Sequence, residues 1–250
     1  MSGHSKWANI KHKKGLADAK KGQVFSKIDK EMMIAVRAHG ADPSSNLTLR
    51  QLMQKARSNN MPADNIERAI KRGTGDTEGE VFEEVTFEGY AHGGVAVVVQ
   101  VLTNNRNRSA AEVRHVFTRH GASFAGQGSV MRSFQRKGHI TVEAAKVSED
   151  QLMELVLEAG AEDLNKDGDQ FEIVSDPAQF MNVVDALNKA GIAMQSSEIT
   201  LLPGAYIPVS DKSKAGALIR FVEDLEDLDD VQNVYMNFDI APEILEALAK

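Results

Sequence analysis

The sequence contains no cysteine among its 250 residues. It therefore has no disulfide, no thiolate zinc or iron–sulfur site and no cysteine nucleophile, which suits a reducing compartment, and we expect a cytoplasmic protein. Long hydrophobic runs are also missing. The best, GGVAVVVQVL at residues 93–102, has the length of a strand and falls short of the roughly 20 apolar residues that span a bilayer. No apolar stretch follows the basic N-terminal segment as in a secretory signal, so the sequence predicts no membrane partner.

Motifs for catalysis or for cofactor binding are scarce. The seven histidines are scattered, and His115 and His120 are five residues apart, a spacing that does not place both on one helix face as metal ligands. No Gly-x-Ser-x-Gly frame is present, and the glycine-rich GTGDTEGE at residues 73–80 lacks the Lys-Ser/Thr of a Walker loop. We interpret the acidic run EDLEDLDD at residues 223–230 as a solvated edge. The sequence thus predicts a protein that is not an enzyme and holds no cofactor or metal.

What the sequence does have is a sharp division of charge. The whole chain has a net charge of −7, yet residues 1–75 hold 15 Lys and Arg against 6 Asp and Glu, a net of +9. Residues 140–250 hold 7 against 23, a net of −16. Such asymmetry indicates one surface for a polyanion, most simply nucleic acid, and another that repels it or meets a basic partner. The alternative is that the basic stretch is only a solvated helix face.

Most of this positive charge lies in a lysine-rich leader. Seven lysines fall between residues 6 and 27, with a single acid, Asp18, among them. Lysines neutralise phosphates, and aromatic rings stack on bases. The candidate nucleic-acid-binding residues of the leader are Lys6, Trp7, Lys11, His12, Lys13, Lys14, Lys20, Lys21 and Lys27. Trp7 has a second interpretation, as an apolar anchor that docks the leader on the helices that follow.

The pattern of apolar residues predicts three short amphipathic helices after the leader. They lie over residues 23–39, after a cap at Ser45 or Asn46, and over residues 61–73, where Gly73 is expected to end the helix. Past a glycine-rich linker, strands and helices alternate, and two similar helix–turn–strand stretches suggest split β-α-β units. We predict an α+β fold of three domains: a helical, basic domain of residues 1–80, an α+β domain of residues 81–132 and 205–250, and a ferredoxin-like α+β domain of residues 133–204 inserted in it.

A second basic stretch lies where a strand is predicted to end and a helix to begin. From Thr103 to His139 there are seven Lys and Arg and one acid, Glu112. We place the helix start at Ser109, with Glu112 completing a capping box. Because helix N-termini present free backbone N–H groups, arginines there favour a phosphate site, and the candidates are Arg106, Arg108 and Arg114. The alternative is that the neighbouring asparagines cap the turn and the arginines pair with nearby acids.

Four motifs together resemble the YebC family: GHSKWANIKHKK, NMPADNIERAIKRG, TNNRNRSAAEVRHVF and GQGSV. Bacterial members of that family are described as probable transcriptional regulators, and a mitochondrial relative as a translational activator of cytochrome c oxidase subunit I. The resemblance implies three domains, two of them α+β, with the third inserted in the second. It also implies nucleic-acid binding without catalysis. More recent views of the family place it on the ribosome, where it eases stalls at proline-rich sequences.

Two functions with different nucleic-acid targets are consistent with the sequence. A third hypothesis, that the protein is a hydrolase, is disfavoured. The first target is DNA, bound by a transcription regulator, although the sequence offers no clear helix-turn-helix reader. Beyond Arg68 and Arg72, the third predicted helix has few side chains suited to base edges. The second target is ribosomal or transfer RNA, bound by a ribosome-associated translation factor that relieves stalling. The sequence does not indicate an oligomeric state.

Overall fold

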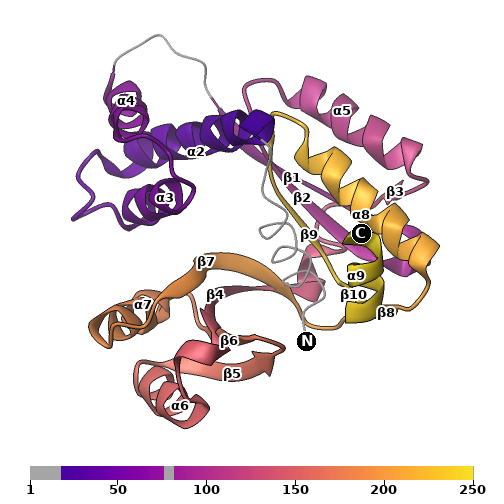
Figure 1. Cartoon of the computed structure of the whole chain (residues 1–250). Helices are drawn as coiled ribbons and strands as arrows, with labels where there is room; N and C mark the ends of the chain where they lie inside the picture. The colour runs from indigo at the N-terminus through magenta and orange to yellow at the C-terminus, as the bar shows by residue number, and fades with distance from the viewer. Residues whose placement is uncertain (1–17, 76–81, 250) are drawn as a thin grey trace. The chain divides into compact units, whose positions relative to one another are not determined.

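A computed structural model describes residues 18–75 and 82–249 of the chain (Figure 1). Residues 132–206 form one compact unit, and the described residues before and after them form another. The second unit contains a helical domain and an α+β domain, and the chain leaves the α+β domain to build the first unit before it returns. The predicted fold class, a helical domain followed by two α+β domains with the third inserted in the second, is confirmed.

The helical domain consists of α2 (Asp18–His39), α3 (Leu47–Ser58) and α4 (Ala63–Thr74). Each helix contributes one apolar stripe to a shared core, formed by Ile28, Met32, Val36, Leu49, Ala56, Ile66 and Ala69. α2 starts earlier than the apolar pattern predicted, because the lysine-rich stretch before residue 23 is made largely of good helix formers. It ends where predicted, at Gly40, whose φ of 85° lies in the left-handed region.

The sequence pattern predicted that Gly73 ends α4, and this prediction is wrong. Gly73 lies inside the helix and is buried against α2. A Cβ atom at this position would lie 2.6 Å from Val36 Cβ and 3.0 Å from the Met33 carbonyl oxygen. The missing side chain therefore lets the two helices approach closely. α4 continues to Thr74, and the rest of the predicted linker, residues 76–80, lies outside the described residues.

The α+β domain is built on an antiparallel sheet with the strand order β3-β1-β2-β9. The hairpin of β1 (Glu83–Tyr90) and β2 (Ala96–Thr103) is central, with β3 (Ser123–Phe124) and β9 (Val231–Met236) at the edges. The valine-rich run that became β2 was predicted to lie in a sheet centre, and it does. α5 (Arg106–Arg119) and α8 (Lys212–Glu226) lie side by side over one face of the sheet (Figure 1).

Smaller elements complete this domain. A parallel pair joins β8 (Ile207–Val209) to β10 (Phe238–Ile240), and the last helix is α9 (Pro242–Ala249). The 3₁₀ helix η1 (His92–Gly94) also belongs to this domain, whereas η2 (Met131–Ser133) lies where the chain enters the inserted unit and η3 (Ala144–Lys146) lies within that unit. The core between the sheet and the helices is formed by Val97, Val99, Val101, Val113, Phe117, Leu218, Phe221 and Val222.

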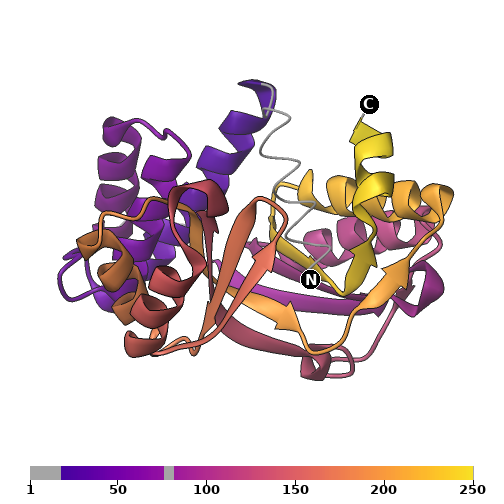
Figure 2. The same ribbon diagram turned by 60° about the horizontal axis from the view of Figure 1, so that its bottom comes forward.

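The inserted unit has the element order β4 (Phe134–Glu143), α6 (Glu149–Glu158), β5 (Ala161–Asp167), β6 (Gln170–Ser175), α7 (Phe180–Lys189) and β7 (Met194–Pro203). Neighbouring strands are antiparallel, in the order β5-β6-β4-β7. This βαββαβ order is the ferredoxin-like topology. α6 and α7 cover one face of the sheet (Figure 2), where they share a core with Ile140, Val142 and Ile173.

We predict that Gly73→Ala destabilises the helical domain by about 1–3 kcal/mol, because the new Cβ atom overlaps Val36. Helix propensity alone would predict the opposite sign. Gly22→Ala is the matched control, because Gly22 is also helical and has nothing within 4 Å of its Cβ position. It should stabilise the protein, by up to about 1 kcal/mol. Urea unfolding followed by circular dichroism measures both changes, and equal effects of the two substitutions would contradict the packing role of Gly73.

Candidate nucleic-acid interface

The structure covers the lysine-rich leader only in part. Lys6, Trp7, Lys11, His12, Lys13 and Lys14 lie outside the described residues. Lys20 and Lys21 fall in the first turns of α2, and Lys27 lies further along the same helix. The contacts of these side chains with nucleic acid stay predictions.

The second predicted site lies at the junction of β2 and α5. Asn105 caps the helix: its side-chain oxygen accepts a hydrogen bond from the Arg108 amide at 3.1 Å. The backbone N–H of Asn105 in turn donates to the Thr103 hydroxyl at 2.9 Å. The capping box predicted at Ser109 is wrong, because the helix begins at Arg106 and Ser109 is a buried residue of its first turns. Asn105 supplies the cap, and the Ser109 hydroxyl bonds to a partner in another segment.

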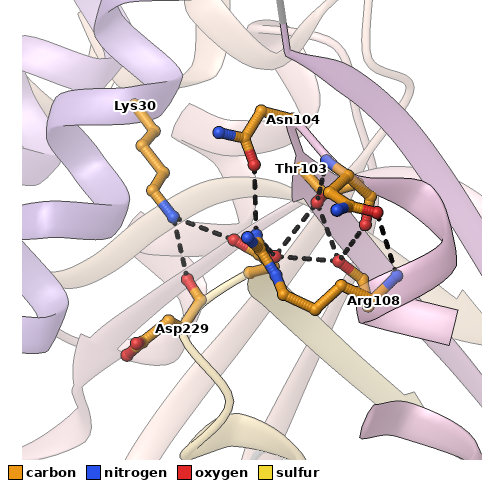
Figure 3. Close-up of polar contacts among 8 residues, drawn as sticks. Lys30, Thr103, Asn104, Arg108 and Asp229 are labelled. Atoms are coloured by element: carbon orange, nitrogen blue, oxygen red, sulfur yellow. Dashed lines mark hydrogen bonds and ion pairs between the residues drawn. The ribbon is translucent and has the colours of Figure 1, made fainter. Parts of the chain in front are cut away.

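That partner is Asp230, whose carboxylate is buried at the start of β9. The hydroxyl groups of Thr103 and Ser109 donate to its Oδ2 atom at 3.0 and 2.8 Å. Arg108 Nη2 donates to the same oxygen at 2.6 Å, and Lys30 Nζ of α2 donates to Oδ1 at 3.1 Å. Figure 3 shows Lys30 and Arg108 converging on this point from two helices. Burial raises the pKa of Asp230, but these hydrogen bonds outweigh it and lower the pKa from 3.8 to about 2.

Among the described contacts, Gln23, Lys27 and Lys30 of α2 bond to the α+β domain. Lys27 Nζ donates to the Glu226 carbonyl oxygen at 2.6 Å, and Gln23 Nε2 approaches that of Asp227 at 3.4 Å. Lys30 Nζ also donates to the Asp229 carbonyl at 3.2 Å (Figure 3). These carbonyls end α8 or follow it, where orphan acceptors and the negative end of the helix dipole favour a cation. Lys27, predicted as a phosphate ligand, thus has a partner within the chain.

The arginines of the second site divide into two groups. Arg108 pairs with the buried Asp230, so for this residue the alternative reading, an arginine paired with an acid beside an asparagine cap, describes the structure. Arg106 and Arg114 are exposed, and no acid among the described residues forms an ion pair with either. The Arg114 guanidinium lies 5.3 Å from the centre of the Phe124 ring, and Arg106 lines a cavity of about 260 Å³ beside the edge of β1. Of the three arginines, Arg106 is the one placed to meet a ligand without giving up a contact with Asp230 or with the Phe124 ring.

The GQGSV motif, residues 126–130, folds around a second buried carboxylate. Glu88 of β1 accepts hydrogen bonds from the backbone amides of Gly128, Val130 and Met131, at 2.5, 2.7 and 2.8 Å. Burial raises the pKa of Glu88, and the three amides more than compensate, so the pKa is lowered. The GQGSV motif therefore has a structural role: the loop folds so that its backbone amides bond to Glu88, and these bonds fix its shape.

The sequence suggested that the acidic run at residues 223–230 is a solvated edge, and the structure bears this out only in part: Asp227 and Asp229 are exposed, but other acids of the run are not. Asp230 is buried, and Asp224 accepts hydrogen bonds from Arg119 and, at 2.6 Å, from His120 Nε2. The run therefore faces basic groups of α2 and α5. Sequence reasoning missed Lys30, Asp230 and Glu88, because a carboxylate inside a charged run or an alternating strand has no local signal of burial.

The described residues offer little for other chemistry. In the part of the chain that the structure describes, no three His, Asp or Glu side chains come together in a way that could hold a metal ion. Within the same residues, no helix has the length and apolar character to cross a membrane.

We predict that Asp230→Asn lowers the free energy of unfolding by about 2 kcal/mol at neutral pH. The folded-state pKa of Asp230 lies below its unfolded value, so its contribution is present above pH 4 and is lost as the pH falls toward 2. The difference between wild type and variant should therefore shrink over that window. Asp185→Asn, at an exposed position of α7, is the control and should change little. A variant as stable as wild type at pH 7 would show that the hydrogen-bonded Asp230 carboxylate does not stabilise the fold.

Comparison with known proteins agrees with this arrangement of domains. The model for the TACO1/YebC protein N-terminal domain matches residues 5–76, and that for the TACO1/YebC second and third domain matches residues 82–238. A probable transcriptional regulatory protein of Syntrophobacter fumaroxidans is 49% identical over 249 residues, 100% of both chains. One of Syntrophus aciditrophicus is 49% identical over 250 residues, again 100% of both.

A solved structure shares the fold. The crystal structure of a conserved hypothetical protein from Aquifex aeolicus superimposes with a TM-score of 0.81 at 45% identity, and covers 91% of this chain and 94% of that one. The family models together account for nearly the whole sequence, and the relatives match it from end to end. The chain belongs to the TACO1/YebC family.

Proposed function

We propose that this protein is a non-enzymatic regulator of gene expression in the cytoplasm, a transcriptional regulator that acts by binding DNA. The observation that carries the proposal is the division of charge, +9 over residues 1–75 in a chain whose last 111 residues have a net charge of −16. Relatives such as those of Syntrophobacter fumaroxidans and Syntrophus aciditrophicus carry the name probable transcriptional regulatory protein, which supports the same role.

The leader supplies most of the affinity in this proposal. Its lysines neutralise phosphates and release counterions, which binds any sequence alike and makes affinity depend on salt. Part of the charge of the helical domain is already used inside the chain, because Lys27, Lys30, Lys55 and Arg72 bond to carbonyl or carboxylate groups. The lysines before α2 are therefore the main phosphate ligands that we propose.

Arg106 is the second contact in the proposal, and Arg108 is left out of it. Arg106 is the first residue of α5, is exposed and has no acidic partner among the described residues. A phosphate that met Arg108 would have to compete with the buried carboxylate of Asp230. Arg108 thus acts indirectly in this proposal: its bond to Asp230 holds the N-terminus of α5, which carries Arg106.

We predict that changing Lys11, Lys13 and Lys14 to Ala lowers the slope of log affinity against log salt by about two to three units on duplex DNA. Arg106→Ala should lower it by about one more, whereas Arg108→Ala should reduce stability more than slope. The control triple variant, Lys189, Lys212 and Lys214 to Ala, makes the same charge change at exposed positions of the acidic half. Fluorescence anisotropy at several salt concentrations gives the slopes.

Two results would contradict the proposal. If the leader variant and the control variant have the same slope as wild type, the leader is only a solvated surface. If ribosomal RNA outcompetes duplex DNA at equal nucleotide concentration and equal salt, the target is the ribosome and the transcriptional role is wrong.

A further inference from the structure

α3 is the only helix of the helical domain without an acidic residue, within the part of that domain that the structure describes. Its exposed side carries Arg50, Gln54 and Arg57, which follow one another at i, i+4 and i+7 and so form one stripe. No acid among the described residues forms an ion pair with Arg50 or Arg57. The third basic residue of the helix, Lys55, is half-buried and pairs with Glu31 at 3.0 Å.

α4 has a different surface. Its first two turns expose Asp64 and Glu67, which repel phosphate. Two of its basic residues already have partners within the chain. Arg68 bonds to the Asn65 side chain and the Asp64 carbonyl, and Arg72 pairs with Asp29 at 2.7 Å. Of the two helices joined by the short turn at residues 59–62, the first is therefore the better suited to approach a nucleic acid.

α3 is also held rigidly. The buried Asn46 caps it by accepting from the Leu49 amide at 2.9 Å, and the same side chain donates to the carbonyl oxygens of Ala35 and Gly40 at 2.8 and 2.7 Å. Leu49 and Ala56, on another face of the helix, are fully buried. The cap and the buried residues thus fix the orientation of α3 in the domain, and direct readout of bases requires such a rigid support.

We propose that α3 enters the major groove of duplex DNA and reads base edges with Arg50, Gln54 and Arg57. This inference rests on the proposed function and adds sequence readout to phosphate binding. At 1.5 Å per residue the stripe spans roughly 10 Å, about the height of three stacked base pairs. Arginine suits guanine and glutamine suits adenine, each with two hydrogen bonds. B-form DNA has a major groove of about 12 Å that admits a helix, whereas that of A-form RNA is too narrow, so duplex DNA is the occupant.

The test is selection of binding sites from a random-sequence DNA duplex library with the full-length chain. Wild type should enrich a motif with about three adjacent specified base pairs. Gln54→Ala should relax one of them, and Arg50→Ala with Arg57→Ala should relax the others, each lowering the ratio of specific to non-specific affinity about 10-fold or more. Lys71→Ala is the control, because Lys71 is an exposed cation of α4, and it should keep the motif. All four positions are exposed and helical, so alanine should leave the fold intact.

The outcomes separate this inference from the proposed function. If wild type binds duplexes with a salt-dependent affinity but enriches no motif, or if the α3 variants enrich the same motif with the same specificity ratio, the readout by α3 is wrong and DNA binding stands. If wild type does not bind duplex DNA at all, both proposals fail.

Discussion

The carboxylate of Asp230 holds together segments that are far apart in the sequence. A buried carboxylate is costly unless charged and polar donors surround it, and here the donors come from α2, the end of β2 and the first turns of α5. The position of the α5 N-terminus and the attachment of the helical domain thus depend on one side chain at the start of β9. The α2 contacts to the end of α8 add to the same attachment.

This arrangement changes how the basic residues are to be understood. A count of charges along the chain treats Arg106 and Arg108 alike, and both are exposed, yet only Arg108 pairs with a buried acid. The same separation applies in the helical domain, where Lys30 and Lys55 have internal partners while Arg50 and Arg57 are exposed. In the function that we propose, the internally paired cations hold the fold in place, and exposed cations without an acidic partner, such as Arg106, meet the nucleic acid.

Features that depend on nearby residues could be predicted from the sequence. The Asn46 cap involves Leu49, three residues on, and the strand and helix periodicities that give the ferredoxin-like unit are equally local. The contacts of Ser109 and Gly73 could not be predicted, because Ser109 meets an acid 121 residues away and Gly73 meets α2 through space. The junction of strand and helix that carries Arg106 was predicted correctly, and its contact with nucleic acid stays a prediction, whereas the pairing of Arg108 with Asp230 needed the fold. The boundaries given for the three domains, at residues 80, 132 and 204, stay predictions.

Asp230 joins the helical domain to the α+β domain through Lys30. A double-mutant cycle tests it most directly, with Lys30→Met, Asp230→Asn and the double variant compared with wild type by urea unfolding at pH 7. Because Lys30 and Asp230 bond to each other, the effects of the two single changes should not be additive, with a coupling energy of about 1 kcal/mol or more. Strictly additive effects would show that the two side chains do not stabilise each other, and would contradict the account.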